Sequence, residues 1–150
     1  VEGSTFQEGH AMLETGTPRI AEAIGWGAAV EWLDRHDMKE IHSHINRIAS
    51  WTAEQISEID GITVYGDPTR GDSSGAVSFL HESIQSQDLA LLLDEGGFAV
   101  RTGHHCAQPL MDALGVPSTN RASFWLYNTM DEAEAFVEHL RYVVDRFSDK

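Results

Sequence analysis

The chain has a single cysteine, Cys106, in 150 residues. One thiol forms no intramolecular disulfide and supplies no cysteine-pair zinc site, so neither holds this fold together. No apolar run approaches the roughly 20 residues that a membrane-spanning helix requires. Residues 1–16 also lack the basic and apolar stretches of a signal peptide. We therefore expect a chain that works in a reducing, cytoplasmic compartment and does not enter a membrane.

Lysine is also scarce. Lys39 and Lys150 are the only lysines among 10 basic residues, against 24 acidic ones, and the formal net charge is −14. A surface this acidic repels the phosphates of nucleic acids and of anionic membranes, so neither is an expected partner. An acid-rich, lysine-poor surface also suits solubility in strong salt, which makes a salt-adapted organism one hypothesis. An ordinary acidic surface is the other.

Hydrophobic residues make up 41% of the chain, enough for an ordered core at this length, so we expect one domain or two small ones. Apolar spacing predicts one helix that starts at Thr17-Pro18 and another over 38–59. Further helices are expected at 86–95, at 106–114, and from a capping box at Thr129 and Glu132 onward, with Phe147 buried in the last. Short apolar runs predict strands at 62–65, 76–80, 98–101 and 122–127. The order favours an α+β fold: a small, mostly antiparallel sheet covered by helices.

Polar side chains are densest in the run 101–109, Arg-Thr-Gly-His-His-Cys-Ala-Gln-Pro, between an expected strand and an expected helix. A thiol at a helix N-terminus, near imidazoles and an arginine, sits where its thiolate is stabilised, so Cys106 is a candidate nucleophile. The alternative is a buried, inert cysteine, a common state of a lone thiol. Because His104, His105 and Cys106 are adjacent, they point in different directions, and we expect no metal site.

Two further segments are candidates. Arg121 stands at the head of an apolar strand, where its guanidinium could grip a carboxylate or form an ordinary surface salt bridge. Gly16 and Thr17 precede an expected helix, whose free amides suit a phosphate, although most such helix starts are merely capped.

Together these pieces resemble one family. The residues that carry the resemblance are Arg101-Thr102-Gly103-His104-His105-Cys106-Ala107, Gln108-Pro109-Leu110-Met111, Arg121-Ala122-Ser123, Tyr127-Asn128-Thr129 and, upstream, Glu14-Thr15-Gly16-Thr17-Pro18. In this order they are similar to the C-terminal part of the group II cysteine desulfurases, the SufS/CsdA-type, pyridoxal phosphate (PLP) dependent enzymes of the class V aminotransferase group. The run 101–107 is a specific signal, because group I relatives carry a different, serine-rich cysteine loop.

The resemblance implies a fold and a reaction. The fold would be the small C-terminal domain of a fold-type I PLP-dependent transferase, with 1–16 as an irregular lead-in from a large domain and 17–150 as the small domain. Cys106 would attack the sulfur of PLP-bound L-cysteine and become a persulfide, and alanine would leave. Arg121 would clamp the substrate carboxylate. Arg101, His104 and His105 would line the cysteine pocket, with one of the two histidines assisting proton transfer.

The resemblance also implies partners that this chain lacks. Gly16 and Thr17 would reach the PLP phosphate of the neighbouring subunit in a homodimer. PLP is held as a Schiff base on a lysine that follows a histidine in the large domain, and neither Lys39 nor Lys150 has that context. We therefore expect the isolated chain to be inactive. The full enzyme would pass its sulfur to an acceptor of SufE/SufU type or to a scaffold for iron–sulfur cluster assembly.

Two alternative functions stay open at this point. Selenocysteine lyase and cysteine sulfinate desulfinase belong to the same family, and the motif does not separate them from cysteine desulfurase. A stand-alone thiol module, which relays persulfide or senses oxidation, is the alternative outside enzymes.

Overall fold

The computed structural model describes residues 3, 5, 7–14, 16–67, 70 and 74–147. The chain divides into two compact units, Val1–Met38 and Lys39–Lys150. None of the helices in these described ranges is long and apolar enough to cross a membrane.

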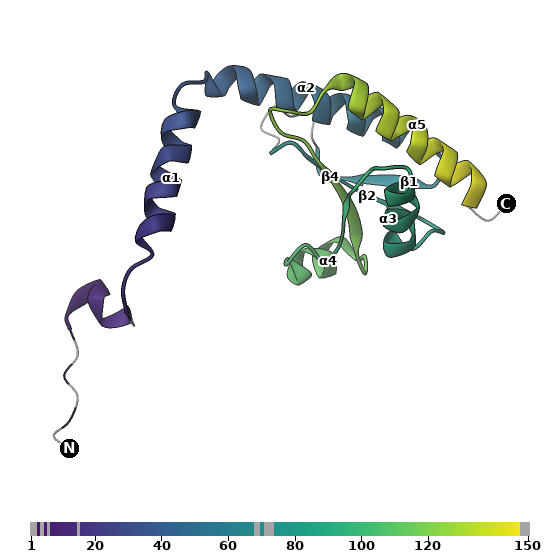
Figure 1. The fold of residues 1–150 in the computed structure, drawn as a ribbon. Helices are drawn as coiled ribbons and strands as arrows, with labels where there is room; N and C mark the ends of the chain where they lie inside the picture. The colour runs from purple at the N-terminus through teal and green to yellow at the C-terminus, as the bar shows by residue number, and fades with distance from the viewer. Residues whose placement is uncertain are drawn as a thin grey trace. The chain divides into compact units, whose positions relative to one another are not determined.

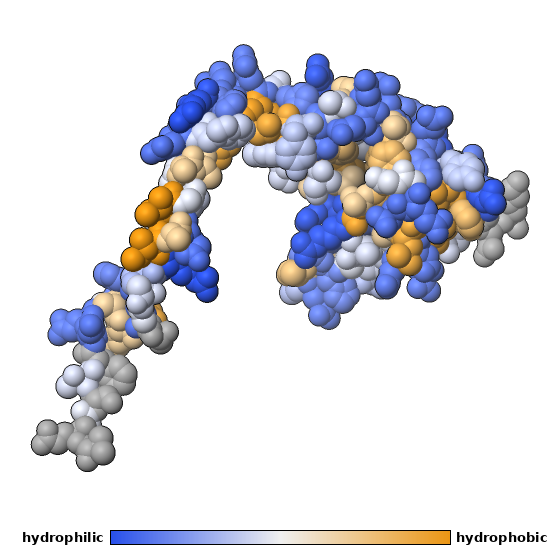
Figure 2. Space-filling model, viewed as in Figure 1, coloured by the Kyte–Doolittle hydropathy of each residue, from blue (hydrophilic) through white to orange (hydrophobic). Residues whose placement is uncertain are grey.

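The first unit holds a short 3-10 helix, η1 (Gly9–Leu13), and a helix, α1 (Ile20–Leu33). The expected start of α1 at Thr17 is wrong, because Arg19 is the N-cap and its carbonyl accepts the first helical bond, from the Ala23 amide at 3.0 Å. α1 carries apolar side chains on all sides, interrupted only by Glu22 and Glu31, yet none of its residues is buried. Apolar side chains gather on its surface (Figure 2), and Trp26 is 75% exposed.

The second unit is a four-stranded antiparallel sheet with helices packed on it (Figure 1). The strands are β1 (Ile62–Tyr65), β2 (Ala76–His81), β3 (Arg101–Gly103) and β4 (Thr119–Ser123), in the spatial order β1-β2-β4-β3. The helices are α2 (Met38–Ser57), α3 (Ser86–Glu95), α4 (Gln108–Leu114) and α5 (Met130–Phe147). The small, antiparallel sheet covered by helices confirms the fold class expected from the sequence.

The hydrophobic core lies on one face of the sheet. β2 alternates, so that Val77 and Phe79 are fully buried against α2, α3 and α5 while the residues between them face the other way. Figure 1 shows α2 and α5 running side by side over this face. The expected burial of Phe147 is wrong: its side chain is 47% exposed, because the apolar stripe of α5 ends at Val144.

Two strands lie elsewhere along the chain than the apolar runs indicate. β3 is Arg101–Gly103 rather than 98–101, and β4 is Thr119–Ser123 rather than 122–127. β4 begins with two buried polar residues, Thr119 and Asn120, and the Nδ2 of Asn120 donates to the Ser86 carbonyl at 2.7 Å. After Ser123 the chain leaves the sheet and turns, because the Asn128 side chain accepts from the Trp125 amide at 2.8 Å.

The capping box that starts α5 is confirmed. The Thr129 hydroxyl accepts from the Glu132 amide at 3.2 Å, and the Glu132 carboxylate accepts from the Thr129 amide at 2.8 Å. The helix expected at 106–114 begins two residues later, at Gln108, because residues 105 and 106 have positive φ angles that no right-handed helix accepts.

Candidate active site

One residue from each strand forms a row across the sheet face opposite the core. The register pairs Tyr65 of β1 with Ser78 of β2, Ser78 with Arg121 of β4, and Arg121 with Arg101 of β3. Since directly paired residues project from the same face, all four side chains stand on this face. Both candidate arginines therefore belong to one surface, 20 residues apart in the chain.

The two arginines of this row are neighbours of like charge. Directly opposed residues in an antiparallel pair have Cα atoms about 4.5–5.5 Å apart, and like charges placed so are destabilising. In addition, the Nε atom of Arg121 is buried and has no hydrogen-bond partner among the described residues. An anion between the guanidiniums would relieve both costs, and a planar carboxylate fits such a fork.

Cys106 lies on a tight turn immediately after β3. The Ala107 amide donates to the His104 carbonyl at 2.9 Å and closes the turn, whose central residues, His105 and Cys106, have φ angles of 54° and 60°. Two positive φ angles mark a type I′ turn, which normally takes Asn and Gly at these positions. For non-glycine residues the left-handed conformation costs about 1–2 kcal/mol each. Such local strain is typical of functional sites.

The Arg101 guanidinium connects the turn to the row. Its Nη2 donates to the Cys106 Sγ at 3.5 Å. The thiol itself is exposed, which contradicts the alternative of a buried, inert cysteine. The turn thus presents the Cys106 sulfur to solvent beside a permanent positive charge.

The two histidines of the motif have different environments. The His104 side chain is exposed, whereas His105 is half-buried and its Nε2 lies 3.0 Å from the Thr119 carbonyl and 2.9 Å from the Thr119 hydroxyl. Burial is the main reason that the pKa of His105 is lowered, and the positive charges of Arg121 and Arg101 lower it further. The neutral form of His105 therefore predominates at pH 7.

A hollow of about 360 Å³ lies between the row and α4, and its lining includes Tyr65, Ser78, Arg121, His105 and Thr119. α4 adds its apolar residues Leu110, Met111 and Leu114. Cys106 does not line the hollow, but its neighbours His105 and Ala107 do. Tyr65, Ser78 and Thr119 were not identifiable from the sequence, because only the strand register brings them here.

The remaining candidates are the residues proposed to bind the phosphate and the two lysines. Gly16 and Thr17 form an exposed bend between η1 and α1 in the first unit. Lys39 lies on α2, which covers the opposite face of the sheet, and Lys150 lies outside the described residues. The site thus suits a carboxylate beside a thiol, and no lysine of the described residues lines it. Within the described ranges, no group of three or more His, Cys, Asp or Glu residues could hold a metal ion.

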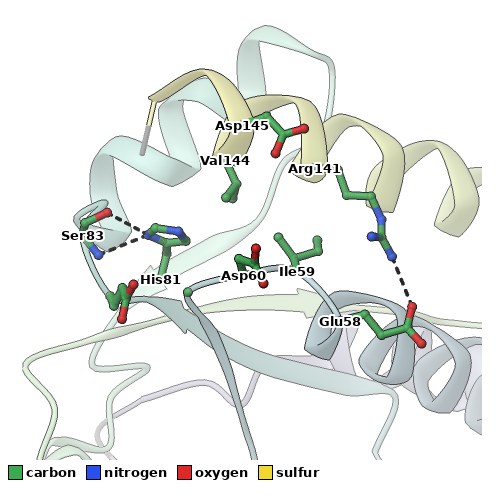
Figure 3. Close-up of a pocket in the computed structure, with 10 residues that line it drawn as sticks. Glu58, Ile59, Asp60, His81, Ser83, Arg141, Val144 and Asp145 are labelled. Atoms are coloured by element: carbon green, nitrogen blue, oxygen red, sulfur yellow. Dashed lines mark hydrogen bonds and ion pairs between the residues drawn. The ribbon is translucent and has the colours of Figure 1, made fainter. Parts of the chain in front are cut away.

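A second hollow, of about 380 Å³, opens beside α5, and the hydrogen-bonding groups on it serve the fold (Figure 3). The His81 Nδ1 accepts from the Ser83 and Ile84 amides, each at 3.1 Å. Arg141 donates to the Gln55 carbonyl at 3.0 Å and pairs with Glu58 at 3.6 Å. These contacts hold the chain around β2 and α5, so the hollow beside α4 is the candidate active site.

Comparisons with known proteins place this chain in one family. The aminotransferase class-V family model matches residues 1–136. A probable cysteine desulfurase of Halalkalibacterium halodurans is 44% identical over 144 residues (96% of this chain, 35% of the relative), and a cysteine desulfurase of Haloferax volcanii is 40% identical over 137 residues (91% and 32%).

Solved structures give the same result. The Escherichia coli cysteine desulfurase CsdA, in an S-sulfonic acid form, matches with a TM-score of 0.85 at 32% identity over 95% of this chain and 35% of its own. The apo cysteine desulfurase of Thermococcus onnurineus matches with a TM-score of 0.86 at 33% identity over 98% and 36%. The chain thus spans about a third of the length of the relatives it matches.

Proposed function

The chain belongs to the class-V aminotransferase family, and from this premise we propose that it is the small, C-terminal domain of a PLP-dependent cysteine desulfurase. The reaction is the conversion of L-cysteine to L-alanine, with the sulfur left as a persulfide on Cys106. The proposed role of that sulfur is iron–sulfur cluster assembly, through an acceptor of SufE/SufU type or a cluster scaffold. The relatives reported above all carry the name cysteine desulfurase, and no observation favours selenocysteine lyase, sulfinate desulfinase or a stand-alone thiol module.

The observation that carries the proposal is the link between Cys106 and the two arginines. Arg101 donates to the Cys106 sulfur and also faces Arg121 across the strand ladder. A bound amino acid could therefore place its carboxylate on Arg121 while its side chain reaches toward Cys106. The unpartnered Nε of Arg121 gives this carboxylate a donor that nothing described in the structure occupies.

The proposed site residues have separate tasks in the reaction. The Cys106 thiolate attacks the substrate sulfur, so that an S–S bond forms and the substrate C–S bond breaks. Arg121 orients the substrate, and Arg101 offers a positive charge beside the thiolate. PLP, when bound, supplies the electron sink for the electron pair released from the broken bond. Gly16 and Thr17 are the proposed contacts to its phosphate, from the partner subunit of a homodimer.

The surface of α1 supports a large domain as partner. A helix with apolar side chains on every side and few charges is typical of a buried element, yet α1 is exposed. About two-thirds of the length of each relative lies outside the matched stretch and could cover α1. We propose that the PLP-binding large domain of the same enzyme contacts α1 and supplies the Schiff-base lysine.

We expect a chimera to show the activity that this chain lacks alone. In it, residues 1–150 replace the matching stretch of the Haloferax volcanii cysteine desulfurase. The chimera should form alanine from L-cysteine and add one sulfur atom to Cys106, measured by mass spectrometry. The isolated chain, given PLP and L-cysteine, should do neither, because it has no suitably placed lysine. A PLP-loaded, folded chimera without alanine formation would refute the proposed function.

The acidic surface leads to a prediction about salt. We propose a cytoplasmic enzyme of a salt-adapted organism, since 24 acidic against 10 basic residues give strong self-repulsion at low ionic strength. Raising KCl from 0.05 to 1 M shortens the Debye length from above 10 Å to about 3 Å. The melting temperature of the chain, measured by circular dichroism, should rise by about 5 °C or more over this range of KCl. A melting temperature that stays level or falls would contradict salt adaptation.

A further inference from the structure

The contact between His105 and Thr119 holds the turn that carries Cys106. We propose that Thr119 is a positioning residue: its carbonyl and hydroxyl oxygens fix the His105 ring, and His105 keeps the turn in its left-handed conformation. The inference rests on the proposed function only in taking Cys106 as the reacting thiol. The geometry of the contact concerns this chain alone.

The contact fixes where His105 carries its proton. A carbonyl oxygen only accepts, so the Nε2 that lies 3.0 Å from the Thr119 carbonyl must be the protonated nitrogen. The Thr119 hydroxyl, 2.9 Å from the same Nε2, is a second acceptor for this N–H. Nδ1 is then unprotonated, and it is buried without a hydrogen-bond partner in the described part of the chain.

The turn needs such a contact because its own residues oppose its shape. His105 and Cys106 have positive φ angles, which are unfavourable for most residues other than glycine and asparagine. Within the turn, one backbone bond between Ala107 and His104 resists relaxation. Thr119 stands on β4, where it pairs with Gly103 at the end of β3, and only 1% of it is exposed. His105 therefore ties the turn to a buried, fixed point of the sheet.

Protonation of His105 should release the turn. A second proton would bind at Nδ1, and no described group accepts a hydrogen bond from the N–H that this would create. The Thr119 carbonyl, which accepts from Nε2, favours a positive charge on His105, but burial outweighs it, and Arg101 on β3, Arg121 on β4 and His104 in the turn oppose that charge further. α4 contributes only apolar side chains to this hollow. Because the pKa of His105 is lowered in the closed turn, the closed turn loses stability as the pH falls below 6.5.

Three variants of the whole chain test the contact. His105→Gln keeps an N–H donor at the reach of Nε2 but cannot titrate. His105→Asn tolerates the left-handed conformation but is too short to reach Thr119. His104→Gln is the matched control at the exposed neighbour. Hydrogen exchange of the Ala107 amide reports turn opening, and the buried Leu140 amide reports global stability.

We expect His105→Gln and His104→Gln to match the wild type at pH 7, and His105→Asn to exchange about tenfold faster at Ala107 with Leu140 unchanged. Below pH 6.5 the opening of the wild-type turn should rise, by at most tenfold per pH unit, and that of His105→Gln should not. Equal or greater protection in His105→Asn would show that conformational preference holds the turn and overturn the proposal. So would an equal pH response in His105→Gln. Neither result depends on desulfurase activity, which the chimera tests separately.

Discussion

The chimera should lose persulfide and alanine formation together when Cys106 is replaced by alanine or serine. The expected loss is at least about 10³-fold in kcat, the order seen when a catalytic nucleophile is removed. Serine keeps the size and the exposed position of the side chain but supplies no thiolate, so its failure would show that sulfur chemistry is required. Steady-state alanine release and intact-protein mass give the two measurements.

Cys106 is the only cysteine of this chain. Extra sulfur found in a proteolytic peptide from residues 1–150 of the chimera is therefore assigned to Cys106. Glu134→Ala is the control, because this exposed side chain lies on α5, which covers the opposite face of the sheet. It should keep activity within about threefold of the parent. A Cys106→Ala chimera that still transfers sulfur at the parental rate would exclude Cys106 as nucleophile.

Arg121→Lys should lower kcat/KM for L-cysteine by about 10–100-fold, and Arg121→Ala by about 10²–10⁴-fold. A hydrogen bond to a charged group contributes about 1.5–3 kcal/mol, and a tenfold change corresponds to about 1.4 kcal/mol. Lysine keeps the charge but loses one arm of the fork, whereas alanine loses both. The measurement is initial-rate kinetics over a range of L-cysteine concentrations.

Arg141→Lys is the matched control, because this guanidinium is engaged by Gln55 on the far side of the sheet. Its kcat/KM should stay within about twofold. Arg121→Ala should not lower the melting temperature of the isolated chain, since it removes a buried, unpartnered donor and a like-charge pair. Equal kinetic losses at Arg121 and Arg141 would mean that general destabilisation, and not substrate binding, explains the effect.

The sequence predicts the helices and the fold class well, because the signals for these are local. The apolar spacing of α2 and the capping box of α5 lie within single elements, and both are confirmed. Strand limits fail where local signals are misleading. Asn120 looks unlike a core residue, yet it is fully buried because Ser86, far along the chain, accepts its hydrogen bond.

The candidate site likewise has residues that the sequence identifies and features that only the structure reveals. The motif residues Cys106, Arg101 and Arg121 are readable from the sequence, and the structure connects them through Arg101. The distinct environments of His104 and His105 are not readable, because only His105 meets Thr119, a residue 14 positions later. The positive φ angles of the turn also escape sequence patterns, since tertiary contacts impose them against the residues' own preference.

The row of Tyr65, Ser78, Arg121 and Arg101 exists in a single strand register. If β4 slipped by one residue against β2, side chains would exchange faces, and a guanidinium would enter the hydrocarbon interior. Molecules with such a slip would be both unstable and inert. The specific activity of a preparation should therefore be proportional to the fraction of molecules with the correct strand register. Molecules with a shifted register should have no activity rather than partial activity.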